Sequence, residues 1–169
     1  MRGFMKRLFI LILALFLLVS CNGRLNLLSY QDGDLCAICK VNGEYTVQIE
    51  KLGEERILSI LEPSELSSVS FIINKEECFG VYGDTRIPLE RDSLQGIVAL
   101  CSIFDLSTDA ISSTSVNESD ATVSFALGGV RFDITYGEDN LPKHVQIHAE
   151  DFSHEVEILD LKHVRVENH

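Results

Sequence analysis

The strongest constraint on the fold of this chain is the alternation of apolar and polar side chains over residues 121–136. Apolar residues stand at every second position on both sides of a central Gly-Gly pair. Such alternation is typical of β-strands with one buried face, and a glycine pair accommodates the positive φ angles of a tight hairpin turn. The pattern therefore predicts a hairpin in which Phe125 lies opposite Phe132 and Val123 lies opposite Ile134.

The stretch LCAICKVNGEYTVQIE at residues 35–50 has the same construction, with Asn42-Gly43 as its turn. An Asn-Gly pair flanked by alternating apolar residues is the strongest short hairpin signal. A two-residue turn at this point predicts that Ile38 lies opposite Val47 and that both face the core.

Cys36 and Cys39 lie in the first strand of that hairpin and form a CxxC motif. Residues three apart on a strand lie about 10 Å apart and point to opposite faces, whereas a disulfide needs α-carbons within about 7 Å of each other. We therefore expect neither a redox nor a zinc site at this motif. The sequence leaves open a disulfide from Cys36 or Cys39 to Cys78 or Cys101, with buried free thiols as the default.

The rest of the chain body reads as strands interrupted by one helix. Apolar residues switch to helical spacing over residues 91–105, and we predict the helix at 92–104. The serine-rich segment 106–121 is predicted to be a mobile loop. Short connections elsewhere favour an antiparallel meander, and hence a mainly β fold with one main helix. The further strands are predicted at residues 56–61, 69–74, 78–82, 142–150 and 153–164.

The N-terminus has the three parts of an export signal, with basic residues within positions 2–7, an apolar run from Leu8 to Val19, and a small residue before Cys21. As a helix this run would span about 18 Å, which is short of the roughly 30 Å of a bilayer core. The four residues that end on Cys21, LVSC, resemble the lipobox of bacterial lipoproteins. The resemblance implies that residues 1–20 are cleaved and that Cys21 carries a lipid anchor.

Cleavage at this point predicts an exported protein on the outer face of a bacterial membrane, or in the outer membrane where the cell has one. Residues 21–34 are then a tether and first segment, and 35–169 form one domain. The signal holds three of the 14 basic residues and none of the 26 acidic ones, which leaves 11 against 26 and a net charge of −15. Because this charge repels phosphate backbones and anionic headgroups, we expect no nucleic-acid partner and no flat docking of the domain on an anionic bilayer.

The polar residues form no recognisable catalytic constellation. His144, Gln146 and His148 share one face of a predicted strand, but the two histidines lie about 13 Å apart along it, which is too far for one ion. We expect this face to be solvated and its reverse, with Val145 and Ile147, to face the core. We predict no metal, no cofactor and no enzymatic activity.

The order of elements over residues 35–164 resembles the carrier superfamily of the bacterial lipoprotein chaperones LolA and LolB. The resemblance rests on GEYTVQIEKLGEERILSILEPSELSSVSFIIN (43–74), the apolar helix and Gly-Gly hairpin that follow, and GEDNLPKHVQIHAEDFSHEVEILDL (137–161). It implies a strongly curved antiparallel sheet, an unclosed barrel, whose concave side is plugged by helix. It also implies that acyl chains or apolar peptide segments bind between the sheet and this plug.

One helix of about a dozen residues shields only part of a wide curved sheet, and the remainder of the apolar face then forms either a collapsed core or a groove for an apolar ligand. We therefore expect a non-catalytic, lipid-anchored binder of acyl chains or apolar peptide. The alternative is an interaction or sensory module of the cell envelope that binds a protein partner through its acidic face or its sheet edges. The candidate lining of the ligand site comprises Phe71, Ile73, Phe125, Phe132, Ile134, Leu94, Ile97, Val98 and Phe104.

Overall fold

The computed structural model describes residues 28–116 and 121–164, and in it eleven strands form one antiparallel sheet. The predicted signal peptide 1–20 and residues 21–27 of the predicted tether, Cys21 included, lie outside the described residues. The strands are β1 (Leu35–Val41), β2 (Tyr45–Leu52), β3 (Glu55–Glu62), β4 (Val69–Ile73), β5 (Cys78–Tyr82), β6 (Thr85–Leu89), β7 (Ile111–Val116), β8 (Ala121–Leu127), β9 (Val130–Tyr136), β10 (Pro142–His148) and β11 (Ser153–His163).

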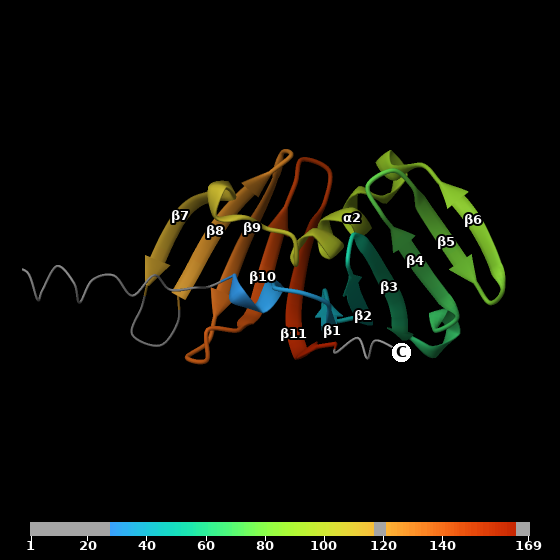
Figure 1. Cartoon of the computed structure of the whole chain (residues 1–169), viewed down its shortest axis with the longest axis horizontal. Coiled ribbons are helices and arrows are strands. Elements are labelled where there is room, and N and C mark those ends of the chain that lie inside the picture. The colour runs from blue at the N-terminus through green and yellow to red at the C-terminus, as the bar shows by residue number, and fades with distance from the viewer. Residues whose placement is uncertain (1–27, 117–120, 165–169) are drawn as a thin grey trace, which may run out of the picture.

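Two meanders make up this sheet, one from β1 to β6 and the other from β7 to β11. Antiparallel pairing of β1 with β11 joins them, so that β6 and β7 become the two outer edges. Figure 1 shows that the sheet is strongly bent and does not close into a barrel. The predicted fold class is confirmed, because the sheet is a curved, unclosed antiparallel meander with one main helix.

The helix α2 (Gln95–Ser102) lies in the connection between the two edge strands, and this connection crosses the middle of the sheet (Figure 1). The 3-10 turn η3 (Arg91–Leu94) precedes it, and Ile103 and Phe104 follow it in a tightened last turn. The predicted bounds of 92–104 were therefore too wide for the α-helix itself. A physical reason is the absence of a side-chain cap at Leu94, which leaves the first turn to the tighter 3-10 geometry.

Three further 3-10 turns complete the described chain: η1 (Ser29–Gln31), η2 (Ser64–Leu66) and η4 (Thr108–Ala110). The turn η1 packs against the end of α2. Tyr30 is buried there, its ring lies edge-on to Phe104 with centroids 6.3 Å apart, and its hydroxyl donates to the Ile103 carbonyl at 3.3 Å. Within the described residues no helix is long and apolar enough to cross a bilayer.

The hairpin of β8 and β9 forms with the predicted register. Phe125 lies opposite Phe132, and Val123 lies opposite Ile134. Gly128 and Gly129 make the turn with φ angles of 58° and 82°, which few residues other than glycine adopt. All four side chains that the register brings together are buried in the core.

The predicted register of β1 and β2 was wrong by one residue. Ile38 lies opposite Gln48, whereas Cys39 takes the place opposite Val47 that a two-residue turn would give to Ile38. The turn bond from the Glu44 amide to the Val41 carbonyl forms, but the strands resume pairing only at Tyr45. The extra unpaired residue turns β1 over relative to β2.

The burial of β1 gives the physical reason for this register. Residues Leu35, Ala37, Cys39 and Val41 are an entirely apolar set, and all four are buried. The other face of the strand ends on Lys40, which is exposed. The observed register avoids placing an ammonium group against the core, which would cost more than one unpaired residue in a turn.

Two strands, β6 and β7, were not predicted from the sequence. Residues 106–121 were expected to form a mobile loop, but Ile111–Val116 pairs with β8. Both strands have weak sequence signals, since β6 contains Pro88 and β7 reads ISSTSV. Each is an edge strand that hydrogen-bonds to one neighbour only, and an edge tolerates proline and polar side chains.

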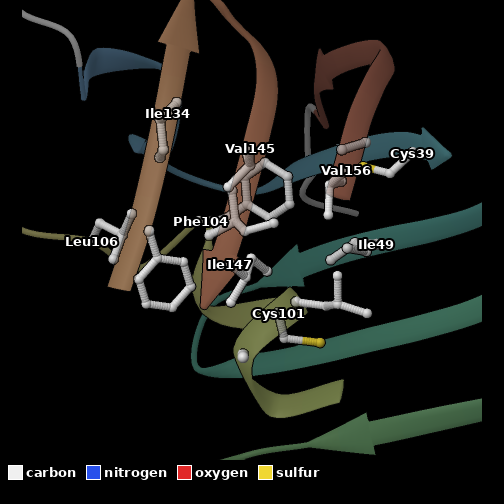
Figure 2. Packing of buried hydrophobic residues seen from close by; sticks show 14 of the residues in the cluster. Cys39, Ile49, Cys101, Phe104, Leu106, Ile134, Val145, Ile147 and Val156 are labelled. Carbon is white, nitrogen blue, oxygen red and sulfur yellow. The ribbon is translucent and has the colours of Figure 1, made fainter. Parts of the chain in front are cut away.

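The hydrophobic core lies between α2 and the middle strands of the sheet. Figure 2 shows Cys101 and Phe104 facing Ile49, Val145, Ile147 and Val156. These residues are almost completely inaccessible to solvent. The predicted alternation of β10 is confirmed, because Val145 and Ile147 are buried whereas His144, Gln146 and His148 are exposed.

Candidate hydrophobic binding site

The sheet extends beyond α2 as a wing formed by β4, β5 and β6 (Figure 1). Side chains directly opposite each other in an antiparallel pair lie on the same face. Phe71 lies opposite the core residue Leu58 and also opposite Gly80, which in turn lies opposite Ile87. Phe71 and Ile87 therefore lie on the face of the wing that continues the core.

Apolar side chains on this face are not fully covered. Tyr82, which lies opposite Val69, is 63% exposed, and Ile87 is 51% exposed. Val69 and Phe71 are half-buried. We call these four residues, Val69, Phe71, Tyr82 and Ile87, the concave wing patch.

A first hollow of about 520 Å³ lies beside α2, where the turns that follow β2 and β4 meet the helix. Ile73 and Val98 give it an apolar side. On β4, Ile73, Phe71 and Val69 alternate along one face, so this row leads from the hollow to the concave wing patch.

Charged residues occupy the other side of this hollow. Arg56, which is 9% exposed, donates from Nε to Asp105 Oδ2 at 2.8 Å and from Nη2 to Asp105 Oδ1. Lys51 Nζ lies 3.6 Å from Asp105 Oδ1 and donates to the Phe104 carbonyl at 3.0 Å. Because two cations share the single carboxylate of Asp105, the group of Lys51, Arg56 and Asp105 has a net charge of +1.

A second hollow of about 350 Å³ lies between α2 and the turn of β8 and β9. Its apolar lining includes Val98, Leu127, Val130 and Phe132. Arg91 contributes to the lining of both hollows, together with Val98 and Ser102.

The structure separates the predicted lining residues into two groups. Phe71, Leu94, Ile97 and Val98 are partly buried and pack against the edge of the core. The others are buried within the core: Ile73, Phe104, Phe125, Phe132 and Ile134. Ile73 and Phe132 nevertheless reach the first and second hollow respectively. Ligand contact by any of the nine stays a prediction.

Two residues of the concave wing patch, Tyr82 and Ile87, were not predicted from the sequence, and neither were the cations of the first hollow. Tyr82 is at the end of a predicted strand, so its face could have been assigned from the alternation Cys78, Gly80, Tyr82. Ile87 was missed because Pro88, the next residue, argues against a strand at this point of the sequence. Lys51 and Arg56 lie opposite each other in the hairpin of β2 and β3, but Lys75 and Arg91 come from other connections, and no local pattern joins them to this hairpin.

Four cysteines occur in the described residues, and all four are free thiols. Cys39, Cys78 and Cys101 are buried, whereas Cys36 is half-buried on the opposite face of β1. Burial raises the pKa of the Cys39 thiol to about 12, and it does the same for Cys101. At neutral pH these thiols are protonated and therefore poor nucleophiles.

No group of three or more His, Cys, Asp or Glu side chains in the described part of the chain is arranged to hold a metal ion. His144 and His148 lie on the exposed face of β10, as expected from the alternation in the sequence.

No protein-family model matches this sequence, and neither does any curated protein. An uncharacterized conserved protein from Thermus thermophilus has a similar crystal structure, with 9% identity and a TM-score of 0.52 over 87% of this chain and 89% of that chain. A LolA superfamily protein from Nitrosomonas europaea is also 9% identical, with a TM-score of 0.39 over 79% of this chain and 85% of that chain. The likeness to the Thermus protein is one of fold.

Proposed function

We propose that this protein is a non-catalytic, lipid-anchored lipoprotein of the bacterial cell envelope that binds an acyl chain along the face of the sheet beside α2. The observation that carries the proposal is the concave wing patch. Tyr82 and Ile87 lie on the face that elsewhere forms the core, yet they are 63% and 51% exposed.

The energetic argument concerns the surface that the helix leaves open. Burying apolar surface is worth about 25 cal/mol per Å², and the middle of the sheet under α2 gains this through residues such as Ile49 and Ile147 (Figure 2). Among the described residues, none covers Tyr82 and Ile87 of the wing in this way. A ligand with apolar surface on two sides would cover Phe71 and Ile87 while it also contacts Val98 of the helix, which lines the first hollow together with Ile73.

The proposed anchor favours an acyl chain as the occupant. Cys21 precedes the first described residue, Leu28, by seven positions. Seven residues reach at most about 25 Å, so a lipid on Cys21 would keep the domain close to a bilayer. Acyl chains are the most abundant apolar groups there. An apolar peptide segment is the competing occupant and is included in the test below.

The anchor has its own experiment. Cells that express the full chain are grown with a radiolabelled fatty acid, and label on the protein is measured. Label is expected on the wild type and on Cys36→Ser, but not on Cys21→Ser, because the lipid is joined to the Cys21 thiol. Label retained by Cys21→Ser would refute the lipobox interpretation.

Binding is tested on the mature chain with Cys21→Ser, titrated with the fluorescent fatty acid cis-parinaric acid. Ile87→Asp is expected to raise the Kd about tenfold or more, since it places a carboxylate where the acyl chain loses apolar contact. Leu159→Asp is the matched control, because Leu159 is 52% exposed but lies on β11, away from the wing. Its Kd should equal that of the wild type.

Three results would count against the proposal. An absence of parinaric acid binding to the wild type contradicts it directly. Equal losses in Ile87→Asp and Leu159→Asp would show that the wing is not the site. Binding of an apolar peptide that parinaric acid does not displace would point to the competing occupant.

A further inference from the structure

The first hollow differs in charge from the rest of the protein. Its lining includes four basic residues, Lys51, Arg56, Lys75 and Arg91, but only two acidic residues, Glu54 and Asp105. The whole chain has a net charge of −12. An excess of positive charge in one concavity of an acidic protein attracts anions to that concavity.

Two of these cations, Lys51 and Arg56, already use most of their N–H groups in bonds within the protein. Arg56 is held by Asp105 and donates from Nη1 to the carbonyls of Gly53 and Glu55, both at 2.7 Å. Lys51 donates to the carbonyls of Gln31 and Phe104 at 2.9 and 3.0 Å. Their charge contributes to the potential of the hollow, but few of their N–H groups are available to a ligand.

Arg91 is in a different situation. Its guanidinium donates through Nη2 to the Asn74 carbonyl, and among the described residues it has no ion-pair partner. The side chain is exposed at the first hollow, with the remaining N–H groups not used by that bond. A planar guanidinium with free donors can hold a carboxylate or phosphate through two parallel hydrogen bonds.

Lys75 offers a second, weaker contact. It pairs with Glu54, and the two side chains are 76% and 73% exposed. Ion pairs this exposed contribute little free energy, so Lys75 can exchange Glu54 for a ligand anion at small cost. Arg91 also borders the second hollow, but Asp92 lies there as well, and the positive excess is confined to the first hollow.

We propose that the first hollow binds the anionic headgroup of the acyl ligand, and that Arg91 is the residue that pairs with it. The inference rests on the proposed function and narrows the ligand to an anionic amphiphile. The headgroup lies between Arg91 and Lys75. The acyl chain leaves it along Ile73, Phe71 and Val69 of β4 toward the wing.

The test uses the mature chain with Cys21→Ser and the neutral apolar probe N-phenylnaphthylamine, displaced by ligands that share one oleyl or oleoyl chain. Oleate and oleoyl lysophosphatidic acid carry a carboxylate and a phosphate, whereas oleyl alcohol is neutral. At least one anion is expected to displace the probe about tenfold more effectively than the alcohol. The better anion identifies the headgroup chemistry.

Arg91→Gln keeps an amide donor for the Asn74 carbonyl while it removes the charge. It should weaken binding of the better anion about tenfold and leave oleyl alcohol unchanged. Arg131→Gln is the control, because Arg131 is an exposed arginine on β9 that pairs with Asp133. This variant should bind all three ligands as the wild type does.

The outcomes separate the two proposals. If oleate, lysophosphatidic acid and oleyl alcohol all bind with equal affinity, the headgroup site is refuted and the acyl-chain site stands. If an anion is preferred but Arg91→Gln keeps that preference, the assignment to Arg91 is refuted. If no ligand displaces the probe, the proposed function itself fails.

Discussion

Replacing Phe104 with alanine is expected to lower the free energy of unfolding by about 3 to 5 kcal/mol. Phe104 is completely buried and packs the end of α2 against the sheet (Figure 2) and against Tyr30 of the N-terminal turn η1. Its ring contacts Tyr30 in an edge-on arrangement with an interplanar angle of 83°. The substitution removes apolar contacts on all sides and leaves a cavity that rigid neighbouring strands cannot close.

Urea unfolding followed by circular dichroism measures this loss. Leu159→Ala is the control, because a side chain that is 52% exposed leaves no cavity, and its loss should stay within about 0.5 kcal/mol. A loss below about 1 kcal/mol for Phe104→Ala would mean that the helix end is not packed into the core as described.

The second large effect is expected for Asp105→Ala, which should cost about 2 to 3 kcal/mol. Its carboxylate is the counter-charge of Arg56, whose side chain is only 10% exposed. Without Asp105, Arg56 and Lys51 remain as two cations held close together, and the Arg56 side chain stays largely shielded from bulk water. The side chain of Asp105 is itself 36% exposed, so the loss falls below that of a fully buried ion pair.

Asp160→Ala is a close control for this experiment. The side chain of Asp160 is 39% exposed and also pairs with one cation, but its partner Lys162 is 73% exposed. Because Lys162 is solvated after the substitution, the expected loss is within about 0.5 kcal/mol. Similar unfolding free energies for the two variants would show that the burial of Arg56 has no energetic consequence.

Hairpins were predictable where the turn chemistry and the alternation agreed. The Gly-Gly hairpin has no extra residue in its turn, so the opposition of Phe125 and Phe132 followed directly from the sequence. The Asn42-Gly43 hairpin has one unpaired residue, and its register depended on which face of β1 the rest of the molecule would bury. The position of Lys40 was a local signal for the correct face.

The edge strands were not predictable in the same way. β7 is rich in serine and threonine, and β6 contains a proline. Neither segment has an apolar pattern that favours a strand. Each forms one because a neighbouring strand, β8 or β5, presents unpaired backbone groups, and backbone pairing does not depend on side-chain pattern.

The residues of the candidate site were also predictable only where a local sequence pattern indicates them. Phe71, Ile73 and Val98 could be named from periodicity because each lies on the apolar face of a recognisable element. The excess of positive charge in the first hollow could not be predicted from the sequence. Arg56 lies in β3, Lys75 in the bend between β4 and β5, and Arg91 in the connection to α2, so only the folded chain brings their charges together.

The sequence by itself determined that this chain forms a mainly antiparallel sheet with one helix, because period-two and helical spacing are local properties of side-chain burial. It also predicted the lipid anchor at Cys21, which lies outside the described residues. Only the tertiary structure decided the register of β1 on β2, which edges the sheet has, and where apolar surface stays open. Those features depend on the position of α2, which covers the middle of the sheet and leaves the wing of β4 to β6 exposed.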